Sequence, residues 1–153
     1  MNTNQLFTKA DSLHEDKSYK EAFSLFMEGA KLGDTSCMNR IACMYSSGEG
    51  VELNYDNALE WELKAIELGD LTAMTNAGIT YRNKGEIVKS KEWFEKSLQN
   101  GDGSAAIQLA KLYMVSDKET EKVKQYLSIA IGHENMTESC IEEANELLLS
   151  LND

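Results

Sequence analysis

The sequence repeats itself at intervals of 32 to 36 residues. A large apolar residue recurs at steps of 36, 32 and 33 residues, at Leu25, Trp61, Trp93 and Tyr126. A series of tyrosines recurs in the same way, at Tyr45, Tyr81 and Tyr113. Repeats of this length are typical of arrays of small supersecondary units, because each unit buries its apolar face against the next one.

Small residues flank the large ones at helical spacing. Three positions before the large residues stand Ala22, Ala58, Ser90 and Val123, and four positions after them stand Gly29, Ala65, Ser97 and Ala130. Residues three or four apart share one face of a helix, and small ones let a neighbouring helix approach closely. We therefore expect the large residues, Trp61 among them, to be buried wedges between helices.

The joints between the expected helices also repeat, as Gly33-Asp34, Gly69-Asp70 and Gly101-Asp102. Glycine suits the left-handed position after a helix, and aspartate suits the N-cap of the next helix. Capping boxes are expected at residues 18–21 and 116–119. The pattern predicts helices near residues 3–16, 19–32, 34–47, 54–68, 70–84, 87–99, 102–116, 118–131 and 136–151.

These helices predict an all-α fold of about four helical hairpins and a C-terminal capping helix, in a single domain over residues 1–153. The chain contains no proline, which would break a helix interior. The last helix has its apolar residues on one side and its glutamates on the other, as a terminal repeat of a stack requires.

One repeat is specific enough to indicate a family. From Tyr45 the chain reads Tyr-Ser-Ser-Gly-Glu-Gly-Val. The residues that continue this repeat pattern are Asp56, Ala58, Trp61, Lys64, Ala65, Gly69 and Ala73. Residues 45–73 resemble the Sel1-like repeat, a relative of the tetratricopeptide repeat (TPR), and the shorter units resemble the TPR form. The resemblance implies a right-handed α-solenoid with the first helix of each hairpin on the concave side. It implies protein binding and names no ligand.

The charge of the chain narrows the class of partner. Its formal net charge is −11 at pH 7, with 26 acidic against 15 basic residues. This charge argues against nucleic acid and anionic membranes as ligands, and it favours a protein or peptide partner, of which a basic one suits the field best. No signal-peptide pattern and no long apolar run is present, and the three cysteines form no CxxC pair. We therefore expect a cytoplasmic protein with reduced thiols.

No pattern of catalytic or ligand-binding residues emerges from the sequence. His14 and His133 belong to no spaced metal-ligand set, and Cys43 has no histidine near it. The glycines at 48 and 50 lack the strand and the Lys-Ser/Thr of a phosphate loop. We expect no enzyme activity, no cofactor and no metal site.

Two surfaces are candidates for partner binding. The first is the concave face, which is formed by the first helix of each hairpin. Its candidate residues are mixed in type and nearly free of acid: Asn39, Cys43, Ser46, Thr75, Ile79, Arg82, Ile107, Lys111 and Met114. The alternative surface is acidic and lies on the last helix, at Glu138, Glu142, Glu143 and Glu146. A second acidic run, residues 49–70, includes Glu62 and is expected to be a solvated face or a docking surface.

The two surfaces correspond to two functional hypotheses. The first is a non-catalytic interaction module, an adaptor or scaffold, that binds a protein or peptide. The alternative is an acidic bacterial immunity protein that neutralises a basic toxin in a 1:1 complex, since opposite charges accelerate association.

Overall fold

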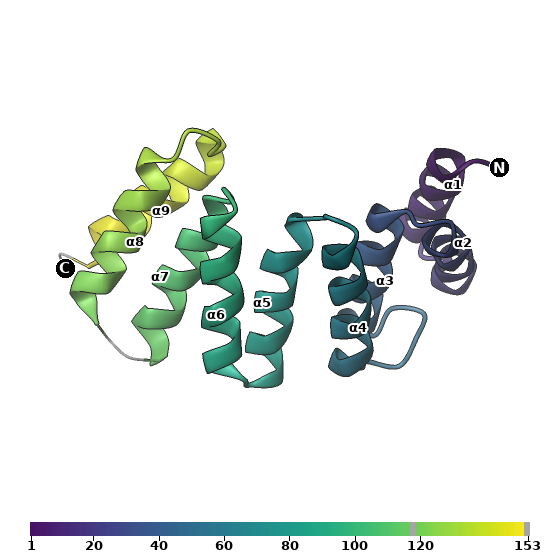
Figure 1. Cartoon of the computed structure of the whole chain (residues 1–153), viewed down its shortest axis with the longest axis horizontal. Helices are drawn as coiled ribbons and strands as arrows, with labels where there is room; N and C mark the ends of the chain where they lie inside the picture. The colour runs from purple at the N-terminus through teal and green to yellow at the C-terminus, as the bar shows by residue number, and fades with distance from the viewer. Residues whose placement is uncertain (117–118, 152–153) are drawn as a thin grey trace. The chain divides into compact units, whose positions relative to one another are not determined.

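The computed structural model describes residues 1–116 and 119–151, where all regular structure is helical (Figure 1). The chain divides into two compact units, residues 1–85 and 86–153. The first unit contains α1 Thr3–Glu15, α2 Tyr19–Lys31, α3 Thr35–Ser47, α4 Tyr55–Glu67 and α5 Thr72–Lys84. The second contains α6 Ile87–Gln99, α7 Ser104–Ser116, α8 Thr120–Gly132 and α9 Glu138–Ser150. The single domain over residues 1–153 stays a prediction.

The predicted all-α repeat fold is confirmed. Each described helix begins and ends within two residues of its predicted limits. Within the first unit α3 packs on α2, α4 and α5, and within the second α8 packs on α7 and α9. Short connections force consecutive helices to run in opposite directions, so each unit is built from helical hairpins.

The helix joints follow the predicted chemistry. Gly33, Gly69 and Gly101 have φ angles of 87°, 90° and 96°, in the left-handed region that favours glycine. Asp34 accepts a hydrogen bond from the backbone N–H of Cys37 at 2.9 Å and caps α3. The Gly-Asp pair therefore acts as predicted before α3. Before α5 the N-cap is Leu71, which makes no capping hydrogen bond, and Asp70 instead accepts a hydrogen bond of 3.0 Å from the backbone N–H of Thr72.

The predicted capping box at residues 18–21 is wrong. Ser18 precedes α2 but makes no capping hydrogen bond through its side chain. Its backbone is not in the extended conformation of a typical N-cap, and it follows Lys17, which has a positive φ of 61°. A capping box that was not predicted joins Asn2 and Gln5. Of the box predicted at 116–119, Ser116 ends α7 and Glu119 is the N-cap of α8 without a capping hydrogen bond from its side chain, while residues 117–118 lie outside the described residues.

The predicted burial of the small flanking residues is confirmed, and the predicted burial of the large residues is wrong. The eight flanking residues, from Ala22 to Ala130, are all buried. The four predicted wedges are only half-buried, and the fully buried rings stand one residue later, at Phe26 and Phe94. Trp61 lies at the edge of its core, and the Nζ of Lys64 lies 4.4 Å from its ring centroid. Successive residues of a helix point about 100° apart. The large side chain that faces the core is therefore the residue after each predicted wedge, and the predicted wedge itself lies at the edge of the core.

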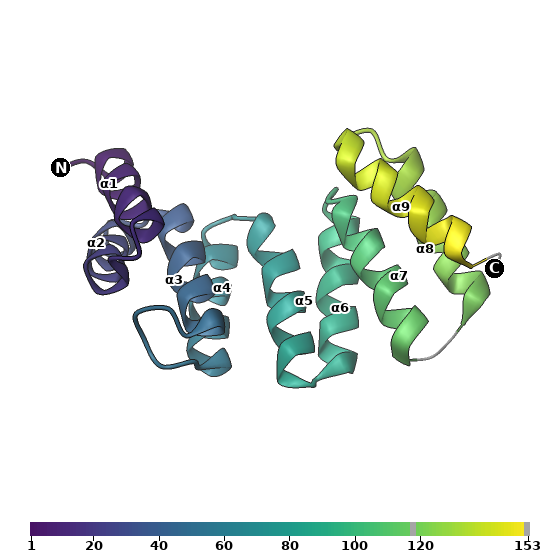
Figure 2. The ribbon, with the colours of Figure 1, turned by 180° about the vertical axis from the view of Figure 1, so that it is seen from behind.

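The long loop between α3 and α4 packs on the corner between α1 and α2 (Figure 2). His14 Nε2 lies 2.9 Å from Glu49 Oε2, so the loop is held by this hydrogen-bonded pair. Gly50 has a φ of 72°, and a Cβ added there would lie 2.8 Å from the Cβ of Tyr19 and 2.9 Å from its carbonyl oxygen. Glycine at position 50 is required both by the backbone conformation and by this close approach.

Gly50→Ala is therefore expected to lower the free energy of unfolding by about 2–4 kcal/mol, because a left-handed conformation and a clash with backbone act together. Gly69→Ala is the control, since Gly69 also has a positive φ but no atom within 4 Å of an added Cβ. Urea unfolding followed by circular dichroism measures both. Equal losses for the two variants would contradict the packing of this loop against Tyr19.

Candidate functional site

A small pocket opens where α3 and α5 flank α4, entirely within the first unit. Its volume is about 130 Å³. Residues from the three helices line it: Cys43, Ser46, Glu62, Asn76, Ile79, Thr80 and Asn83. Three of the predicted groove residues, Cys43, Ser46 and Ile79, are brought together here. We call this site the Glu62 pocket.

Among the described residues that line the pocket, Glu62 is the one acidic residue, and its side chain is buried. The residue is 3% exposed, although it belongs to the acidic run that the sequence predicted as a solvated face or a docking surface. Its Oε1 accepts a hydrogen bond of 2.8 Å from the buried Thr80 hydroxyl. Its Oε2 is buried and has no hydrogen-bond partner, and the same holds for the Oγ of Ser46. The pocket therefore contains two buried polar atoms whose hydrogen-bonding capacity is unused.

The electrostatics of the pocket follow from burial. Loss of solvation raises the pKa of the Glu62 carboxyl to about 7, and the hydrogen bond from Thr80 opposes this rise. Desolvation also raises the pKa of the Cys43 thiol, and the charge of Glu62 adds to the effect. A thiol with a raised pKa is a poor nucleophile, so Cys43 is suited to contact and not to attack.

The other predicted groove positions of the first unit differ in their environments. Asn39 is half-buried and donates through Nδ2 to Asp70 Oδ2 at 2.8 Å. Thr75 is buried, at 8% exposed, so it offers little surface to a partner. Arg82 is half-buried. The expectation that this face is nearly free of acid is wrong, because Glu62 lines the pocket together with the predicted groove residues.

The predicted groove positions of the second unit are largely used within that unit. Ile107 is 2% exposed and belongs to the core of α7, α8 and α9, so its assignment to a binding surface is wrong. Lys111 forms an ion pair with Glu143, which joins a predicted groove residue to the acidic alternative surface. Met114 lines a shallow hollow with Thr120, Val123 and Leu151.

The acidic alternative surface is open on α9. Glu138, Glu142 and Glu146 are exposed, and Glu143 is half-buried beside Lys111. The second acidic run is more dispersed than its sequence suggests. Glu49 pairs with His14, Asp56 with Lys84 and Glu60 with Lys64.

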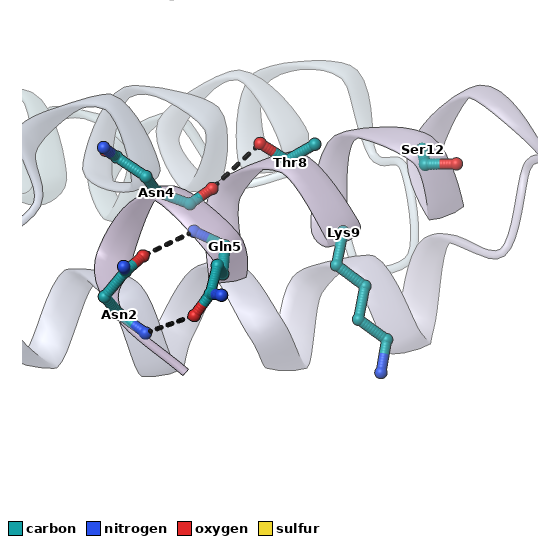
Figure 3. Close-up of a pocket in the computed structure, with 6 residues that line it drawn as sticks. All are labelled: Asn2, Asn4, Gln5, Thr8, Lys9 and Ser12. Carbon is teal, nitrogen blue, oxygen red and sulfur yellow. Dashed lines mark hydrogen bonds between the residues drawn. The ribbon is translucent and has the colours of Figure 1, made fainter.

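A wider hollow lies on the outer face of α1 (Figure 3). The residues that line it are all exposed: Asn2, Asn4, Gln5, Thr8, Lys9 and Ser12. Asn2 and Gln5 are used by the capping box, and the Thr8 hydroxyl donates to the Asn4 carbonyl at 2.9 Å. With no buried polar atom among them, these residues form a solvated helix face.

In residues 1–116 and 119–151, no three His, Cys, Asp or Glu side chains cluster closely enough to hold a metal ion. Over the same ranges, no helix has the length and hydropathy needed to cross a membrane.

The repeats that build this pocket resemble a known family of repeats. The Sel1 repeat family model matches residues 35–70 and 73–102, which contain all of α3 and α4 and all of α5 except its first residue, Thr72. The chain is also 32% identical over 103 residues to a sel1-like repeat-containing protein of Acanthamoeba polyphaga mimivirus. The chain contains Sel1 repeats. The second match, 73–102, includes a unit whose shorter loop had suggested the TPR form.

Solved structures of Sel1-like repeat proteins share this fold. A Sel1 repeat protein from Oxalobacter formigenes is 25% identical, with a TM-score of 0.64 over 84% of this chain and 56% of that one. A protective antigen of uropathogenic Escherichia coli with an SLR fold matches 99% of this chain and 38% of that one, with a TM-score of 0.72 and 17% identity. The mimivirus match covers 66% of this Sel1-like chain but only 19% of that protein. This chain thus spans a minor part of the mimivirus relative and about half of the Oxalobacter structure.

Sequence reasoning missed Glu62 as a site residue of this Sel1-like chain. A glutamate in an acidic run is normally solvated, so its residue type indicated an exposed side chain. Its position in the repeat indicated a buried one. The signal was present in the spacing, because Glu62 follows Trp61 as Phe26 follows Leu25. Comparing the residue after each predicted wedge would have shown a carboxylate at an otherwise apolar position.

Proposed function

We propose that this chain is a non-catalytic module that binds a protein or peptide on the face formed by α3 and α5. Sel1 repeats generally mediate protein–protein interaction, and these two helices belong to the matched repeats. The observation that supports this face most directly is the Glu62 pocket, where Cys43 and Ile79 border buried polar atoms without partners. Such unfilled hydrogen-bonding capacity is typical of a site that an external group completes.

A non-catalytic role agrees with the chemistry of the thiols. Burial raises the pKa of Cys37 to about 12 and also raises that of Cys43, so both thiols stay protonated at neutral pH. A catalytic cysteine needs the opposite shift, from a nearby cation or a helix N-terminus. The carboxyl of Glu62 has a raised pKa, but none of the described residues that line its pocket is a nucleophile with an activating base.

The formal net charge of −11 at pH 7 favours a basic partner. The exposed glutamates of α9 provide a second surface that such a partner can approach. Beyond charge, no contact among the described residues favours the narrower hypothesis of an immunity protein that neutralises a toxin. The proposal therefore stays with the general binding module.

Affinity capture from an extract of the source organism tests this function. The full chain is immobilised as wild type, as Cys43→Trp, which covers the pocket from its exposed rim, and as a Glu138→Lys, Glu142→Lys, Glu146→Lys variant. We expect the wild type and the α9 variant to retain the same protein at near-stoichiometric yield, and Cys43→Trp to lose it. Retention of no protein by the wild type, even at low salt, contradicts the proposal. Loss by the α9 variant alone assigns binding to the acidic surface instead.

A further inference from the structure

Glu62 occupies a position that is apolar in the other repeats. Steps of 36, 32 and 33 residues, the spacing of the repeat itself, connect Phe26, Glu62, Phe94 and Leu127. The three apolar members are 0% exposed, and Glu62 is 3% exposed. The second repeat thus places a carboxylate where the others place a core side chain. A buried carboxylate without a cation destabilises a fold, so stability gives no reason for it.

The pocket leaves that carboxylate half satisfied. Thr80 donates to Oε1, while Oε2 has no partner. The unpartnered Oγ of Ser46 lies in the same lining. None of the described residues that line the pocket is lysine or arginine, so the described lining itself supplies no counter-charge to the carboxylate. A carboxylate accepts hydrogen bonds only, so the group that completes it must be a donor, and a cationic donor offsets its desolvation best.

The charged and titratable groups around Glu62 are few. From α3 the pocket receives Cys43, whose thiol pKa is influenced by Glu62 and, in the opposite direction, by Arg40. The residues that α5 contributes are Asn76, Ile79, Thr80 and Asn83, none of which titrates. The protonation state of Glu62 is therefore set by its own burial, by the hydrogen bond from Thr80 and by whatever enters the pocket.

We propose that the Glu62 pocket receives one basic side chain, lysine or arginine, from a protein or peptide partner. The inference rests on the proposed function and specifies its partner. The ammonium or guanidinium group donates to Glu62 Oε2 and to Ser46 Oγ, and its aliphatic stem lies against Ile79. A volume of about 130 Å³ suits a single side chain and excludes a folded element.

Binding of a cation requires the ionised carboxylate. Because the pKa of Glu62 in the empty pocket is about 7, the ionised fraction of its carboxyl group falls roughly tenfold between about pH 8 and about pH 6. The apparent affinity for a basic side chain falls by the same factor.

The test uses the full chain, labelled with ¹⁵N, and three capped pentapeptides. Each peptide has glycine at four positions and lysine, arginine or uncharged norleucine at the centre. Amide chemical shifts at about pH 8 and about pH 6 report where and how tightly each peptide binds. The variants are Glu62→Gln, which keeps an acceptor for Thr80, and the matched control Glu60→Gln, which removes an exposed charge from the same helix.

We expect the lysine peptide, the arginine peptide or both to shift amides around Ser46 and Thr80 saturably, and the norleucine peptide to leave them unchanged. The affinity is expected to fall roughly tenfold at the lower pH. Glu62→Gln is expected to weaken binding at least about tenfold and to remove its pH dependence, whereas Glu60→Gln retains both. The ratio of the lysine to the arginine affinity identifies which basic side chain the pocket prefers.

Three outcomes overturn the inference: no saturable shift with either basic peptide, equal binding of norleucine, or equal binding by Glu62→Gln. Each of them leaves the proposed function separately testable. A protein captured equally by wild type and Glu62→Gln shows a binding module that does not use this carboxylate. Capture of no protein by either one contradicts the module itself.

Discussion

Replacement of Phe26 by alanine is expected to lower the free energy of unfolding by about 3–5 kcal/mol. Phe26 is 0% exposed, and its ring lies 5.7 Å from that of Phe7, centroid to centroid. Alanine loses the transfer free energy of the ring and leaves a cavity between packed helices, which relaxes only in part. Urea unfolding followed by circular dichroism gives the free energy of each variant.

Leu25→Ala is the matched control for Phe26→Ala. Leu25 is the residue that the repeat pattern predicted as the wedge, but it is only half-buried. Its truncation removes less contact and is expected to cost about 1–2 kcal/mol, because the transfer term scales with the buried area. A larger loss for Leu25→Ala than for Phe26→Ala would contradict the assignment of the core to the later position.

The pH dependence of stability provides the second large effect. The pKa of Glu62 rises from 4.5 to about 7 on folding. The folded state therefore binds a proton more tightly than the unfolded state, and stability falls as the pH rises from about 4.5 to about 7. The full difference is on the order of 3 kcal/mol, since one pKa unit corresponds to about 1.4 kcal/mol. Urea unfolding at a series of pH values between about 5 and about 8 measures it.

Two variants separate Glu62 from the general charge of the chain. The 26 acidic residues also repel one another less at low pH, so the wild-type profile alone does not identify one group. Glu62→Gln is expected to be more stable than wild type at about pH 8 and to lose this part of the pH dependence. Glu60→Gln, at an exposed position, is expected to retain it. Parallel profiles for wild type and Glu62→Gln would show that Glu62 titrates normally.

The sequence predicted the helices of this chain well because their signals are local. Small residues at helical spacing and Gly-Asp joints recur in each repeat, and each has a direct backbone or packing consequence. Gly33 adopts the left-handed conformation and Asp34 caps α3, as the pattern indicated. The packing face was placed less well, because residues adjacent in a helix both lie near the core and differ by about 100° in direction.

The candidate site was only partly predictable. Cys43, Ser46 and Ile79 were named as groove residues and do meet in one pocket, because positions on the first helices of adjacent repeats lie close together. Ile107 was misassigned, because it is 2% exposed and belongs to the core of α7, α8 and α9. Thr75, which stands at the same repeat position in the first unit, is buried as well. Glu62 was missed because its residue type indicates solvent, while its burial depends on α3 and α5 on either side. Contacts of this kind arise from tertiary packing and have no local signal.

Hydrogen–deuterium exchange of the full chain, with and without the captured partner, tests binding at the Glu62 pocket most directly. We predict that the partner slows exchange in α3 and α5, most strongly around Ser46 and Thr80, and that Glu62→Gln weakens this protection. The amides of α9 are predicted to exchange at the same rate in both states. Protection confined to residues 138–150, or equal protection in Glu62→Gln, would contradict the account.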